Sequence, residues 1–133
     1  MTSTSRFDVL RFNKDLIDRL RPWLPPEVRL TAAADAVTLE NDRGETVTLF
    51  VADLFERSPS EEAAVRAAHQ ILDGVQDFVT EELGEPWPAQ GEDGDSQAVP
   101  SAEERNGVVE LWYGDQVAPA LALSPMRLAE YRG

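Results

Sequence analysis

The chain contains no cysteine among its 133 residues. Disulfides, zinc–thiolate sites, iron–sulfur clusters and a cysteine nucleophile are therefore excluded. Histidine occurs once, at His69, and one imidazole without thiolates cannot build an ordinary zinc site. No apolar run approaches the roughly 20 residues that a transmembrane helix needs. Residues 1–6 also lack the basic start and the apolar stretch of a signal peptide. We therefore expect a cytoplasmic protein without a resident metal or cofactor.

Basic side chains are scarce, with 12 Lys and Arg against 25 Asp and Glu, which gives a formal net charge of −13. Direct binding to nucleic acid or to an anionic membrane is disfavoured, because both need a basic face. The charge either keeps the protein soluble, or mimics nucleic acid, or attracts a basic protein partner. Lys14 is the only lysine, a usage typical of a GC-rich bacterial genome or of a salt-adapted organism.

The length predicts a single domain over residues 1–133, with residues 1–6 disordered. A first, short helix is predicted over about 13–21. Asn13 is a suitable N-cap residue, and Pro22 limits the helix because a proline disfavours helical geometry at the residue before it. The segment that follows is rich in proline and reads as a rigid connector.

A β-hairpin is predicted from two alternating segments, 37–40 and 46–51, which a short polar turn joins. Gly44 suits the left-handed position of that turn. A weaker strand is expected at 28–30. The apolar residues of the hairpin are expected to share one buried face: Val37, Leu39, Val47, Leu49 and Val51.

The strongest local pattern predicts a long helix over about 59–83. Ser58 as N-cap, Pro59 at the first helical position and Glu61 three residues after the cap form a helix-start signal. Gly84 is a natural C-cap. An apolar stripe at helical spacing runs along the helix and consists of Ala64, Ala68, Ile71, Val75, Phe78 and Val79.

Two further strands are predicted after the turn at Asn106 and Gly107. Residues 108–113 are rich in strand-forming side chains, and 117–123 could return beside them, with Pro119 placing this segment at a sheet edge. Segregated helical and extended blocks favour an α+β fold. We expect one antiparallel sheet of about four to five strands, covered by the helix at 59–83, with the shorter helix at 13–21.

Residues 90–104 are predicted to be a mobile acidic loop. A calcium site counted from Asp93 fails, because Ala98 occupies the position that requires glycine and Pro100 interrupts the loop. The loop is therefore expected to act through charge and exposure. Its acidic residues are Glu92, Asp93, Asp95, Glu103 and Glu104.

The candidate binding residues are Trp87, Trp112, Tyr113 and His69. Tryptophan side chains either anchor interfaces or fill the edges of a small core. Trp87 is expected to pack back onto the domain beside Trp112. His69 lies beside the apolar stripe without a recognised nucleophile, so a structural or surface role is favoured, and no catalytic residue is assigned.

The segment from Glu82 to Pro88, which ends a long helix, followed by a loop and a strand with Trp112, resembles small actinobacterial proteins of unknown function. In those proteins a Trp-Pro precedes a Cys-Pro-x-His-type loop. Here residues 89–91 are Ala-Gln-Gly, so the cysteine and histidine positions are vacant. The resemblance covers about residues 75–115 and implies a shared helix–loop–strand frame and a bacterial origin.

The leading functional hypothesis is a non-enzymatic, acidic protein-interaction module with a basic partner, acting as a monomer or a homodimer. One alternative is a small-molecule-binding domain or enzyme with a pocket between the long helix and the sheet, lined by Trp87, Trp112 and Tyr113 with His69 as its imidazole. The other is a nucleic-acid mimic that inhibits a DNA-binding protein, which requires carboxylates spaced like phosphates on one face.

Overall fold

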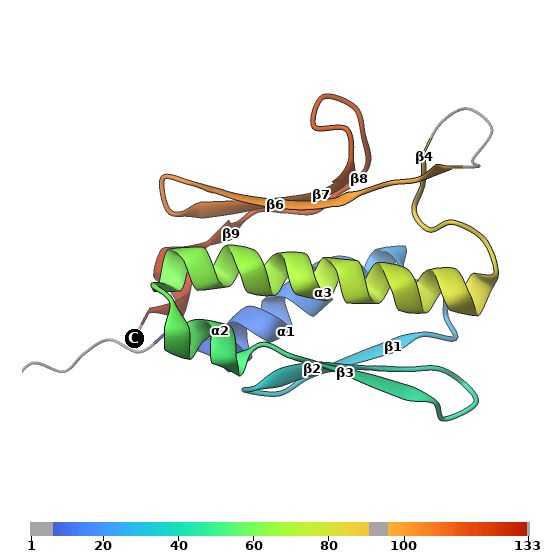
Figure 1. The fold of residues 1–133 in the computed structure, drawn as a ribbon, viewed down its shortest axis with the longest axis horizontal. Helices are drawn as coiled ribbons and strands as arrows, with labels where there is room; N and C mark the ends of the chain where they lie inside the picture. The colour runs from blue at the N-terminus through green and yellow to red at the C-terminus, as the bar shows by residue number, and fades with distance from the viewer. Residues whose placement is uncertain (1–6, 91–95, 133) are drawn as a thin grey trace, which may run out of the picture.

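Two antiparallel sheets enclose a central layer of helices (Figure 1). The computed structural model describes residues 7–90 and 96–132. The α+β class is as predicted, but the strands form two sheets of three and four strands instead of one. The long helix is consequently covered on two opposite faces, whereas the sequence pattern predicted a single covered face.

The first sheet has the order β1 (Arg29–Ala32), β2 (Ala36–Glu40) and β3 (Thr46–Phe50). The predicted hairpin is confirmed, and Gly44 has a φ of 79° in its turn. Val37 and Leu39 are fully buried. Val47 lies on the same face, yet it is 43% exposed, because β3 is at the edge of the sheet.

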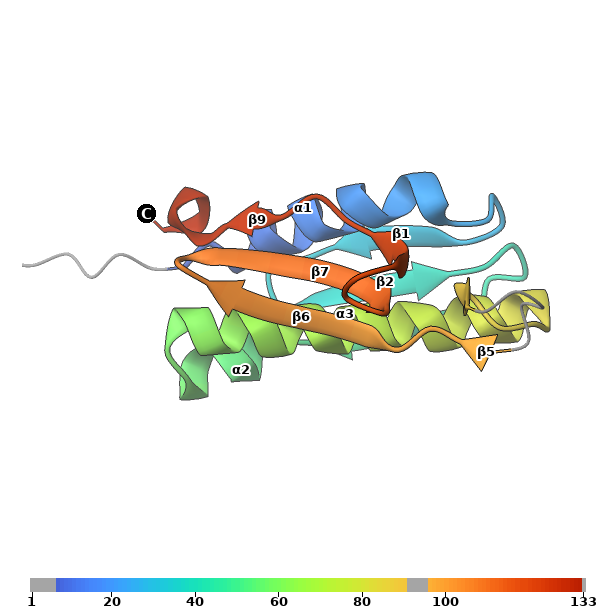
Figure 2. The same ribbon diagram turned by 90° about the horizontal axis from the view of Figure 1, so that it is seen from above.

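The second sheet is built around β7 (Val108–Gly114), which pairs on one side with β6 (Pro100–Arg105). On its other side β7 pairs with β8 (Pro119–Ala122) and then β9 (Met126–Arg127), as Figure 2 shows. Pro119 is in an edge strand next to a register shift, as predicted. A separate two-stranded pairing joins β4 (Ala89–Gln90) and β5 (Ser96–Gln97).

The predicted loop over 90–104 is therefore corrected, because residues 100–105 form β6. The Asn106–Gly107 turn connects β6 to β7, and both of its residues have positive φ angles of 55° and 80°. The remainder of that loop, residues 91–95, lies outside the described residues, as does the predicted disordered segment 1–6.

Helix α1 (Val9–Leu20) begins four residues earlier than predicted. Asp8 is its N-cap, and its carboxylate accepts a hydrogen bond from the backbone N–H of Arg11 at 3.1 Å. Asn13 is not a cap: it is buried within the helix, and its Nδ2 donates to the carbonyl oxygen of Ala33 at 2.9 Å. Asn13 thereby ties α1 to the end of β1.

Helix α3 (Ser60–Leu83) confirms the predicted long helix, and Gly84 ends it in the left-handed conformation. Ser58 has extended geometry and ends the preceding short helix α2 (Ala52–Arg57), which the sequence did not predict. Short 3-10 turns at Arg21–Trp23 and Leu128–Tyr131 complete the elements. Among the described residues, no helix combines the length and apolar content needed to cross a membrane.

Both covered faces of α3 pack at short range. Tyr113 of β7 is fully buried, and its hydroxyl donates to the carbonyl oxygen of Leu72 at 2.6 Å. On the opposite face, a β-carbon added to Gly74 would lie 2.6 Å from Cδ1 of Leu49. The absence of a side chain at Gly74 therefore permits the close approach of Leu49 from the first sheet. The N-terminal half of α3 also carries four small, fully buried side chains: Ala63, Ala64, Ala67 and Ala68.

We expect the effect of Gly74→Ala on the free energy of unfolding to depend on Leu49. Alanine favours a helix over glycine by about 1 kcal/mol, but overpacking against Leu49 costs ~1–3 kcal/mol. In a Leu49→Ala background the clash disappears, so Gly74→Ala should then stabilise by about 1 kcal/mol. Urea denaturation of the four proteins measures this coupling. Equal effects of Gly74→Ala in both backgrounds would contradict the close approach.

Candidate functional site

The aromatic binding candidates do not converge on one pocket. Tyr113 points into the core, whereas Trp112, its neighbour on the same strand, lies on the outer face of the sheet, because successive strand residues alternate in direction. Trp87 packs against the Tyr113 ring, with centroids 5.5 Å apart in an edge-on arrangement. Trp87 thus returns to the domain, but on the inner side of β7, away from Trp112.

Because Trp112 faces away from Trp87 and Tyr113, these three aromatic residues do not line one pocket between α3 and the second sheet. Burial raises the pKa of the Tyr113 hydroxyl well above its usual range, and the charge of Asp73 adds to this effect. The hydroxyl is therefore a neutral hydrogen-bond donor to Leu72.

His69 is exposed on the surface of α3. Among residues 7–90 and 96–132, no three acidic or histidine side chains converge as metal ligands. The structure therefore brings His69 into no metal-binding arrangement within this range.

The predicted acidic residues occupy two different settings. Glu103 and Glu104 belong to β6, where Glu103 is paired in register with Glu110 and Glu104 accepts a hydrogen bond from the N–H of Gly107 at 2.7 Å. Glu92, Asp93 and Asp95 lie outside the described residues. The acidic character of this region is thus partly carried by a strand.

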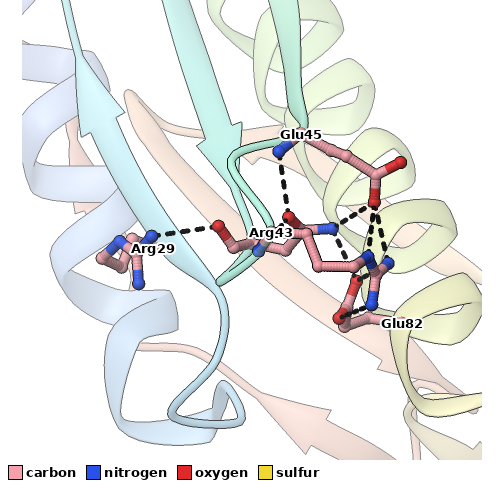
Figure 3. A network of polar contacts seen from close by, with 5 residues as sticks. Arg29, Arg43, Glu45 and Glu82 are labelled. Atoms are coloured by element: carbon pink, nitrogen blue, oxygen red, sulfur yellow. Dashed lines mark hydrogen bonds and ion pairs between the residues drawn. The ribbon is translucent and has the colours of Figure 1, made fainter.

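A polar network joins the β2–β3 turn to the end of α3 (Figure 3). We call it the Asn41 network; its members are Asn41, Arg43, Glu45 and Glu82. Asn41 is 2% exposed. Its Nδ2 donates to Glu45 at 2.8 Å and to Glu82 at 2.9 Å, while its Oδ1 accepts from the backbone N–H groups of Arg43 and Glu45, each at 3.0 Å.

Charge pairing completes the Asn41 network. The Arg43 guanidinium lies 2.8 Å from a Glu45 oxygen and 3.3 Å from a Glu82 oxygen. Hydrogen bonding to Glu45, followed by the charge of Glu82, raises the pKa of Arg43. Hydrogen bonds from Asn41 and then Arg43 lower the pKa of Glu45. The network therefore favours the charged form of the Glu45 carboxylate and fixes the hairpin against α3.

A cleft of 180 Å³ opens beside this network, between the hairpin and the C-terminal half of α3. We call it the hairpin cleft. Val47 and Phe78 give it apolar walls, and Glu81 brings a further carboxylate to those of Glu45 and Glu82. It also borders Thr46, the first residue of β3.

The outer edge of β3 is the second feature of this region. The Val51 N–H donates to the Asp35 carbonyl at 2.9 Å, and the Asn41 N–H donates to the Glu45 carbonyl at 3.1 Å. Since hydrogen-bonded and non-hydrogen-bonded pairs alternate along an antiparallel ladder, the backbone groups of residues 46, 48 and 50 point away from β2. We call these groups the open edge of β3.

One group of this edge is already engaged, because Gln70 donates from its Nε2 to the Phe50 carbonyl at 2.8 Å. Within the described residues, no hydrogen bond engages the edge-directed groups of Thr46 and Thr48. The strand itself, Thr-Val-Thr-Leu-Phe, carries no charge, and Phe50 is 66% exposed.

Acidic side chains line the exposed surface of α3 as it approaches this edge. Asp73, Asp77 and Glu81 are spaced four residues apart and therefore form one row along the helix; we call them the acidic row. None of the three forms a salt bridge within the described residues. The last turn of α3 contains no basic residue, although the helix dipole would favour one there.

Neither the open edge nor the acidic row was predicted from the sequence. The i, i+4 spacing of Asp73, Asp77 and Glu81 was a readable signal in the sequence. The position of β3 at an edge depends on strand pairing far along the chain, which local patterns do not encode.

Removal of the buried amide in Asn41→Ala should destabilise the protein by about 1–3 kcal/mol, because the Glu82 carboxylate, whose side chain is 10% exposed, loses a donor. Chemical denaturation at neutral pH measures the loss. Asn41→Asp is the matched variant: it keeps the acceptor oxygen but brings a third carboxylate to Glu45 and Glu82, so it should destabilise as well. An unfolding free energy that is unchanged in both variants would show that the Asn41 network does not stabilise the fold.

The lowered pKa of Glu45 also predicts a pH dependence. A carboxylate with a lowered pKa in the folded state stabilises the protein above its unfolded pKa of about 4.3, and this contribution is lost as the pH falls through the folded value. Glu45→Gln should therefore flatten the decline of the unfolding free energy below about pH 4.3. Parallel pH profiles for the two proteins would rule out this coupling.

Comparison with known proteins adds no assignment: no protein-family model, no curated protein and no solved structure matches this chain.

Proposed function

We propose that this protein is a protein-interaction module that binds an extended, basic segment of a partner protein by adding it as a strand to the open edge of β3. The observation that carries the proposal is the coincidence of two features. An uncharged strand edge has free backbone groups at Thr46 and Thr48. It lies beside Glu81, the last member of an acidic row that forms no salt bridge within the described residues.

The other sheet edges differ from β3. At β1, Arg21 donates to the Leu30 carbonyl at 3.3 Å, and α1 packs alongside. Strand β6 begins at Pro100 and ends in three charged residues, while β8 begins at Pro119. Proline, charge and cover are the usual protections of a strand edge against added strands. Their absence at β3 supports a role in binding.

Charge supports a basic ligand over a neutral one. Like charges four residues apart destabilise a helix by a few tenths of a kcal/mol per pair, so the acidic row costs stability in the free protein. A basic strand beside β3 would offset this cost. The net charge of −13 would also steer such a partner and make its association rate sensitive to salt.

Strand addition is tested with Thr48→Pro. The N–H of Thr48 points away from β2, so proline removes a donor to the added strand and leaves the β2–β3 ladder intact. The probe is a displayed library of random nine-residue peptides, selected on the unchanged protein. We expect the selected peptides to be rich in Lys and Arg, to bind less tightly at high salt, and to lose about tenfold or more in affinity for Thr48→Pro.

Thr48→Val is the control, because it keeps the backbone donor and the branched side chain. It should bind the selected peptides like the unchanged protein, and circular dichroism should show all three proteins folded. Selected peptides that bind Thr48→Pro undiminished, or a selection that yields no binder, would overturn the proposal.

A further inference from the structure

We infer that the hairpin cleft is a specificity pocket for one arginine side chain of the added strand, at the position opposite Val47. The inference rests on the proposed strand addition and adds to it the identity of a ligand residue. Two independent features meet here. The first is the open edge of β3, to which a ligand strand would pair. The second is the adjoining hairpin cleft, whose walls are both apolar and acidic.

Strand geometry fixes which ligand residue reaches the cleft. Directly opposed residues of paired strands point to the same face of the sheet. Val47 lies on the inner face with Leu49, toward α3, whereas Thr48 between them lies on the outer face. The ligand residue opposite Val47 therefore points toward Phe78 and Glu81. Its neighbours along the strand point away from the cleft.

The charges of the cleft are unbalanced in favour of a cation. Arg43 forms salt bridges with both Glu45 and Glu82, so these two negative carboxylates share one positive charge. Glu81 is exposed and has no salt bridge within residues 7–90 and 96–132. One further positive group beside Glu81 is thus accommodated without displacing Arg43.

The apolar walls select a long side chain rather than a small cation. Val47 is 43% exposed and Phe78 is only partly buried, so both can cover the methylene stem of a basic residue. Arginine is favoured over lysine because its planar guanidinium can bind a carboxylate with two parallel hydrogen bonds. A volume of 180 Å³ provides room for one such side chain.

The test uses synthetic nine-residue peptides of alternating valine and threonine, with one arginine moved through the five central positions. We expect one register to bind best, and replacement of that arginine by glutamine to weaken binding about tenfold, with lysine intermediate. In Glu81→Gln this preference for arginine should vanish, while the glutamine peptide binds as before. Asp115→Asn, which makes the same charge change on an exposed turn away from the cleft, should preserve the preference.

The outcomes separate the two proposals. If Thr48→Pro abolishes binding but Glu81→Gln leaves the arginine preference intact, the specificity pocket is wrong and strand addition stands. If Thr48→Pro binds every peptide as the unchanged protein does, strand addition itself fails. An arginine preference that is equal at all five positions would indicate general attraction to the acidic surface, and would likewise overturn the pocket.

Discussion

The packing of α3 between two sheets is the constraint on which the rest of this structure depends. A helix covered on two faces can be approached closely by both sheets only where its buried side chains are small. The buried alanines and Gly74 meet this requirement. Glycine inside a helix costs about 1 kcal/mol relative to alanine, and here it permits the approach of Leu49. Only one strip of α3 remains open to solvent, and its C-terminal half is occupied by the acidic row.

The same packing determines the position of β3 beside the exposed strip of α3. The two sheets leave α3 exposed between the edges of β3 and β6, so one edge strand must lie beside each side of the exposed strip. On the β6 side, the strand carries its own charges. On the β3 side, the strand is neutral, and the Asn41 network holds the hairpin tip against α3. Stability alone would favour basic partners for the acidic row and protection of the β3 edge, and the described residues provide neither. Such departures from stability are typical of functional sites.

Elements with strong local signals could be predicted from the sequence, whereas their arrangement could not. The hairpin with Gly44 and the helix ending at Gly84 depend on turn chemistry and periodicity within one segment. Strand β6 was missed because Glu103, Glu104 and Arg105 read as a solvated loop, and only pairing with β7 makes them a strand. Asp8 and Asn13 are equally good caps by residue type, and the choice depends on the distant Ala33 carbonyl. The divergence of Trp112 and Tyr113, by contrast, follows from their adjacency and was predictable.

An exposed strand edge also invites pairing with a second copy of the same chain, and the charge of this protein opposes that outcome. Each copy carries a net charge of −13, and Glu81 of the acidic row lies beside the edge. Two copies pairing through β3 would bring their acidic rows close together, and this repulsion is strongest at low salt. A basic strand meets attraction at the same place. The acidic surface therefore discriminates against self-association and in favour of a basic partner, so β3 can remain open without the protection given to the other edges.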